Sequence, residues 1–141
     1  MLQVLPPTTD PAMSIAYWCI FIAALLPYLW VVVAKRGPQF DNHDPRDWLA
    51  RQDNPRVKRA NAAHLNAFEA FAPFAAGVLM AQAAGVDARL ITTLALIFVA
   101  LRIAHGIFYV TNVHVLRSLS WLGGLSCVLY LMGAAAVRIA G

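Results

Sequence analysis

Charged side chains are scarce in this sequence. They make up 13% of the 141 residues, whereas 60% are hydrophobic. Soluble domains carry about 25% charged residues, so this composition is typical of a protein that sits in lipid. We therefore expect residues 1–141 to form a single all-α integral membrane domain.

Cysteine is nearly absent, and the first twelve residues contain neither Lys nor Arg. Cys19 and Cys127 both lie in apolar runs without metal-type spacing, which excludes a disulfide framework and a zinc site. A cleavable signal peptide needs a charged start, so we expect no cleavage. His43 lies near Asp41 and Asp44, but no second ligand cluster accompanies them. We interpret this segment as a solvated loop and predict no metal site.

Basic residues are confined to one segment. Seven of the eleven Lys and Arg residues lie between Lys35 and Arg59, in a chain whose net charge is +4. A nucleic-acid-binding surface would need a broader basic stripe, so we expect no nucleic-acid partner. The positive-inside rule instead places a loop of about residues 35–58 in the cytoplasm and both termini on the opposite side. This predicts a multi-pass protein of the cell inner membrane that contacts membrane lipid.

Four apolar segments are long enough to approach the roughly 20 residues that a membrane span requires. They cover about residues 13–34, 60–84, 90–110 and 119–140. Asn54 and Pro55 indicate that the second helix begins before its span, because Asn is a good N-cap and Pro suits the first helical position. Gly85 and Asp87 predict a tight turn between the second and third helices. The sequence therefore predicts a four-helix bundle.

Five polar side chains enter the second and third spans at matching distances from this turn. They are Asn66, Glu69, Arg102, His105 and Tyr109. A carboxylate in hydrocarbon costs about 2.5–3.5 kcal/mol on insertion scales, so Glu69 needs a partner. We predict that Glu69 pairs with Arg102 and that His105 lies beside them.

Spacing alone leaves three interpretations of this polar layer open. It could be an ion pair that locks the helices together, a ligand site open to the cytoplasm, or an ion or proton path. The polar groups stop about halfway across the membrane, which disfavours the path. Basic residues at the cytoplasmic mouth would attract an anionic head group. They are Lys35, Arg36, Arg59, His114 and Arg117. Arg117 could equally be an ordinary snorkelling residue.

Two motifs resemble a known family, the membrane-associated proteins in eicosanoid and glutathione metabolism (MAPEG), in a bacterial-type form. The first is Arg59…His64-Leu-Asn66-Ala-Phe-Glu69 on the second helix, and the second is Arg102-Ile-Ala-His105-Gly-Ile-Phe-Tyr109 on the third. Arg117-Ser118 after a short connection also fits. The resemblance implies a homotrimer with glutathione bound between subunits near the cytoplasmic face.

The resemblance also implies roles for individual residues. Asn66 and Glu69 would hold the glutathione peptide, while Tyr109 and the Arg102–His105 layer would line the same cleft. Arg117 looks like the family arginine that stabilises the thiolate, and Arg36 lies where some members place a second functional arginine. Arg59 and His64 belong to the same binding motif.

The sequence departs from the family pattern at three positions. Ala62 and Leu65 stand where family enzymes usually carry arginine, and Trp121 replaces a common aromatic hydroxyl. Two functions stay open. One is a glutathione-dependent transferase or peroxidase acting on lipophilic electrophiles. The other is a non-catalytic membrane protein that binds a lipid or serves as an accessory subunit of a larger complex, which the loss of the arginine clamp favours.

Overall fold

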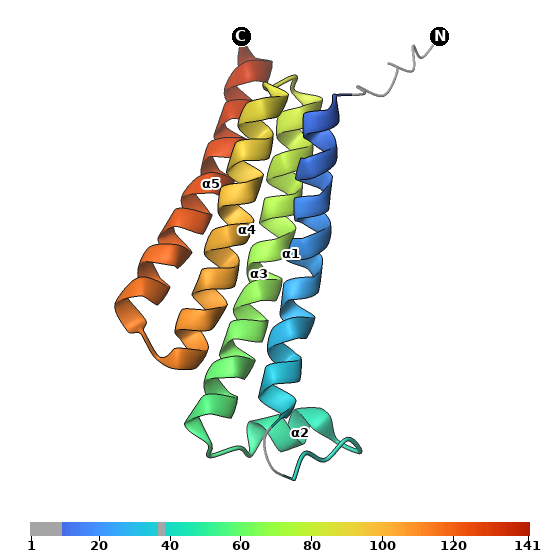
Figure 1. Cartoon of the computed structure of the whole chain (residues 1–141). Helices are drawn as coiled ribbons and strands as arrows, with labels where there is room; N and C mark the ends of the chain where they lie inside the picture. Colours follow the sequence, from blue (N-terminus) through green and yellow to red (C-terminus); the bar gives the residue numbers. More distant parts are fainter. Residues whose placement is uncertain (1–9, 37–38) are drawn as a thin grey trace.

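The computed structural model describes residues 10–36 and 39–141, and the regular structure of this part of the chain is entirely helical. Five helices follow one another (Figure 1): α1 Pro11–Lys35, α2 Pro45–Ala50, α3 Pro55–Ala83, α4 Ala88–Thr111 and α5 His114–Ala140. Four of them are long, and each long helix runs antiparallel to the next one along the chain. α2 is a short helix in the polar loop. The predicted all-helical fold is confirmed.

Local end signals explain where the long helices begin and turn. The side chain of Asn54 accepts a hydrogen bond from the Arg56 N–H, and that of Asp87 accepts one from the Leu90 N–H. Each cap satisfies a backbone donor that has no partner within the first helical turn. Gly85 adopts φ +71°, a left-handed conformation that glycine tolerates best. The predicted tight turn between α3 and α4 is therefore confirmed.

The two central helices, α3 and α4, each contact both α1 and α5. Phe74 of α3 and Phe98 of α4 stack face to face with ring centroids 3.8 Å apart, at the centre of the main hydrophobic core. Gly106 allows α4 to approach α1, because a Cβ at this position would lie 2.0 Å from Cζ2 of Trp30. The Trp30 ring thus occupies space that any other residue at position 106 would need.

Within the described residues, three helices are long and apolar enough to cross a membrane: α1, α4 and α5. Large apolar side chains are exposed on them, for example Trp18, Leu129 and Val137. Exposed apolar surface of this extent suits contact with lipid. The chain is therefore a multi-pass membrane protein. α3 does not meet the same criterion, since its first half carries several polar residues, so the predicted fourth span stays a prediction.

The two ends of the bundle differ in character (Figure 1). The start of α1, the α3–α4 turn and the end of α5 lie at one end, and α2 lies with the α4–α5 connection at the other. This second end carries the basic segment, except for residues 37–38, which are outside the described ranges. Trp48 and Leu49 of α2 pack against the buried Ala34, Val57 and Ala60 there.

Candidate functional site

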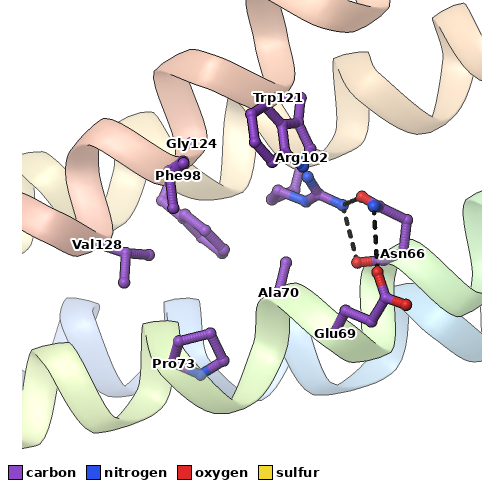
Figure 2. A pocket seen from close by; sticks show the side chains of 10 residues that line it. Asn66, Glu69, Ala70, Pro73, Phe98, Arg102, Trp121, Gly124 and Val128 are labelled. Carbon is purple, nitrogen blue, oxygen red and sulfur yellow. Dashed lines mark hydrogen bonds between the residues drawn. The ribbon is translucent and has the colours of Figure 1, made fainter.

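Arg102 is the centre of the polar layer. Only 5% of its surface is exposed, although it lies in the middle of an apolar helix. Its Nη2 donates to the backbone carbonyl of Asn66 at 3.1 Å and to the Asn66 side-chain oxygen at 2.5 Å. The Asn66 amide nitrogen in turn donates to Glu69 Oε2 at 3.4 Å (Figure 2). Asn66 therefore connects the guanidinium to the carboxylate.

The predicted direct pair between Glu69 and Arg102 needs correction. Neither of the ion pairs within the described residues involves these two side chains, which Asn66 bridges instead. Counting residues from the α3–α4 turn places Glu69 and Arg102 at similar depth. It does not predict which face of α3 carries Glu69. Glu69 lies on an exposed strip of α3, whereas Asn66 turns toward α4.

A partly open cavity of about 200 Å³ adjoins this bridge and is lined by residues of α3, α4 and α5 (Figure 2). Its polar wall is formed by Asn66, Glu69 and Arg102. The rest is lined by Ala70, Pro73, Phe98, Trp121, Gly124, Leu125 and Val128. We call this the inner cavity. It is an apolar chamber with polar groups at one side.

His105 lies one turn beyond Arg102 on α4 and is 3% exposed. Its Nδ1 lies 3.1 Å from the Arg117 carbonyl oxygen, which can only accept, so Nδ1 carries the proton and donates. Nε2 then has no hydrogen-bond partner among the described residues, and neither does Nε of Arg102. Buried polar atoms are normally satisfied, so these two atoms are suited to contact water or a ligand.

Arg117 is held to α4 through its side chain as well as its carbonyl. Its guanidinium carbon lies 4.7 Å from the centre of the Tyr109 ring, a cation–π geometry. The Tyr109 ring in turn packs edge-on against His105 at 5.5 Å. Arg117 is half-buried, so its charge remains accessible from the neighbouring cavity.

That neighbouring cavity measures about 450 Å³ and lies nearer the α4–α5 connection. Its lining is Asn66, His105, Tyr109, Arg117, Ser118, Trp121 and Leu122. We call it the outer cavity. It shares Asn66 and Trp121 with the inner cavity, so the two chambers are neighbours. Its donors suit carboxylates, amides and a thiolate.

Three of the predicted site residues line neither cavity. Nδ1 of His64 lies 2.7 Å from the Pro27 carbonyl and joins α3 to α1. Nε of Arg59 donates to the Val110 carbonyl at 3.3 Å and joins α3 to the end of α4. Arg36 is exposed and follows the last turn of α1. The other predicted residues line one cavity or both: Asn66, Glu69, Arg102, His105, Tyr109 and Arg117.

Several lining residues on α5 were not predicted as part of a site, among them Gly124 and Trp121, which the sequence marked only as a departure from the family pattern. Trp121 and Gly124 lie four and seven positions after Arg117, which places all three on one face of the helix. This spacing could have predicted that Trp121 and Gly124 lie beside Arg117, but both residues are apolar and such residues are common in membrane helices.

Comparison with known proteins agrees with the geometry. A family model described as MAPEG family matches residues 15–137. Among curated proteins and among solved structures, none matches this chain. The family match covers nearly the whole chain, including α3, α4, most of α1 and α5, and the residues of both cavities. This chain therefore belongs to the MAPEG family, the membrane proteins of eicosanoid and glutathione metabolism.

Proposed function

We propose that the chain is a membrane enzyme that uses glutathione to conjugate or reduce lipophilic electrophiles. The observation that carries this proposal is the outer cavity, where Arg117 faces the ring of Tyr109 beside an unsatisfied His105 Nε2. Ligand pockets usually span about 300–1,000 Å³, and the outer cavity falls within that range. The inner cavity alone does not.

The residues of the outer cavity fit glutathione chemically. The peptide has two carboxylates, amides and a thiol, and the cavity offers a guanidinium, an imidazole, a carboxamide and a hydroxyl. When bound, glutathione supplies the thiol whose deprotonated sulfur attacks an electrophilic centre. Arg117 would favour the charged thiolate, because a nearby cation lowers the energy of an anion. Glu69 and Asn66 would hold the peptide at the boundary with the inner cavity.

A second copy of the chain would complete this site. Glu69 is exposed on α3, beside exposed apolar residues such as Leu65 and Phe68. An exposed carboxylate among lipid-facing side chains is costly, so a neighbouring protomer that contributes a polar partner would stabilise it. This supports a contact between subunits at α3. The family resemblance makes the expected assembly a homotrimer with four spans per subunit, and the positive-inside rule places the α2 side in the cytoplasm of a cell whose inner membrane holds the protein.

A second function is favoured by one specific observation. Positions 62 and 65, where family enzymes usually carry arginine, are Ala and Leu, and Leu65 is 53% exposed. A site without these arginines would hold carboxylates less tightly. The alternative is a non-catalytic membrane protein that binds a lipid or acts as an accessory subunit.

Titration with glutathione in detergent separates the two functions. If the enzyme proposal is correct, glutathione will raise the unfolding temperature of the wild type, and Glu69→Gln will lose most of this shift. Asp53→Asn is a matched control, because Asp53 is an exposed acid in the loop before α3 and lines neither cavity. A wild type that shows no shift at millimolar glutathione would refute the enzyme proposal and favour the binder.

A further inference from the structure

We infer that the inner cavity binds an uncharged, single-ring aromatic group that carries a hydrogen-bond acceptor. Arg102 would donate to the acceptor, and Gly124 would set the room for the ring. This inference rests on the proposed function for its biological meaning, since the ring would belong to the electrophile. The binding itself can be measured without glutathione and without turnover.

The size of the inner cavity selects the ring. Its volume is about 200 Å³, and most of its wall is apolar, including Phe98, Val128 and Pro73. An apolar protein cavity of about 150 Å³ holds benzene, whereas water is not retained without several polar partners. The inner cavity therefore has room for one substituted ring. A tripeptide would need the larger outer cavity.

The polar wall selects the acceptor. Nη2 of Arg102 is used by Asn66, but Nε has no partner among the described residues, and the side chain is 95% buried. A ligand oxygen reaching this N–H would satisfy a donor that the protein leaves free. The charge of Arg102 is already balanced by Glu69 through Asn66. A neutral acceptor such as a carbonyl or nitro oxygen thus fits better than a carboxylate.

Gly124 determines how much volume the inner cavity leaves for a ring, because a side chain at this position would extend into the cavity. A Cβ at position 124 would lie 3.4 Å from Cδ of Arg102 and 3.8 Å from the ring of Phe98. Alanine would fit with ordinary contacts, and a larger side chain would fill the space for the ring. Trp121, one turn earlier, lines both cavities, so a ring in the inner cavity would lie next to the outer one.

The test uses the purified full chain in detergent and two fluorinated probes observed by ¹⁹F NMR. 4-Fluoroacetophenone carries a ketone oxygen, and 4-fluorotoluene is a comparable ring without an acceptor. Gly124→Val is the blocking variant. Gly133→Val is its matched control, because it is the same substitution on the same helix and a Cβ at position 133 would have no atom within 4 Å. Circular dichroism and the oligomer mass establish that each variant is folded.

We expect saturable binding of the ketone to the wild type and to Gly133→Val. Gly124→Val should weaken it at least tenfold, and Gly124→Ala should weaken it less. The toluene should bind the wild type at least fivefold more weakly than the ketone. If Gly124→Val does not fold, Val128→Met narrows the same cavity from the next turn and should weaken ketone binding.

Several results would overturn the inference. A non-saturable signal that is equal in wild type and Gly124→Val would show partition into the micelle only. Equal affinities for the two probes would remove Arg102 as the donor. A phospholipid retained by the wild type and lost in Gly124→Val would assign the cavity to an acyl chain, and a changed oligomer mass would assign it to a subunit contact. Ketone binding without any glutathione response would support this inference while refuting the proposed enzyme.

Discussion

Asn66 receives two hydrogen bonds from a single nitrogen of Arg102, one on its carbonyl and one on its side-chain oxygen. This arrangement places the only buried guanidinium of the described residues against a neutral residue. The opposite charge, on Glu69, is reached through the Asn66 amide. Asn66 thus has a structural role besides its proposed part in binding, and mutation can test the structural role.

Replacing Asn66 with Ala should destabilise the protein by about 1.5–3 kcal/mol, the usual range for hydrogen bonds to charged groups. The loss follows because Arg102 would keep only the backbone acceptor. Unfolding in detergent, followed by circular dichroism, measures it. Asn61→Ala is the matched control on the same helix and should change stability by less than about 0.5 kcal/mol. Equal losses in both variants would contradict the bridging role.

Arg117→Ala should abolish glutathione-dependent turnover of lipid peroxides and aryl halides while leaving the helix content unchanged. The reason is that the thiolate would lose its cation, although the bundle core would keep its packing. Arg138→Ala, at the opposite end of the same helix, is the control and should keep full activity. Turnover that survives in Arg117→Ala would assign this arginine to a snorkelling role.

His64→Phe should lower stability by about 0.5–1.5 kcal/mol and leave the glutathione response unchanged. The variant keeps a ring beside Phe68 but removes the donor to the Pro27 carbonyl. Parallel unfolding and glutathione titrations measure the two effects. A lost glutathione response with unchanged stability would mean that His64 contacts the ligand after all.

Gly106→Ala should destabilise the bundle by about 1–3 kcal/mol, the typical cost of overpacking. The new Cβ would collide with the Trp30 indole, which lies 2.0 Å from the required position. The double variant Gly106→Ala/Trp30→Leu should recover part of this loss, because the smaller side chain leaves room. A double-mutant cycle of unfolding energies provides the measurement. Strict additivity would argue against the contact.

The proposed topology predicts that a cysteine at Asp53 is labelled only from the cytoplasm and one at Ala140 only from the opposite side. Both positions are exposed and lie at opposite ends of the bundle. The native Cys19 and Cys127 are buried and would be replaced by Ala. Labelling of intact cells with a membrane-impermeant maleimide measures the accessibility. The reverse pattern would invert the orientation.

Local signals in the sequence predicted most of the fold. Asn54 with Pro55 and Gly85 with Asp87 define helix ends through interactions within a few residues, and the structure contains each of them. Long apolar runs likewise predict helices without knowledge of their neighbours. These features depend on short-range chemistry, which a single sequence contains in full.

The candidate site was predicted less completely, because it depends on how the helices are rotated about their axes. Counting from the turn gave the depth of Arg102 but not the face of Glu69, so the bridging part of Asn66 was missed. His64 belongs to a motif typical of the family, yet it contacts α1. Trp121 shows no chemistry of its own in the sequence, and only the packing of α5 makes it a wall of both cavities.

The contacts that hold Arg117 in place have a consequence for the affinity of the proposed anion site. Its carbonyl is fastened by His105 and its guanidinium rests on Tyr109, so a long and normally mobile side chain is already in position. A ligand arriving there loses little affinity to immobilising that side chain, since each rotamer-rich side chain ordered on binding costs about 0.5–1.5 kcal/mol. If the outer cavity binds an anion as proposed, this preorganisation would strengthen the binding relative to a site with a freely rotating arginine.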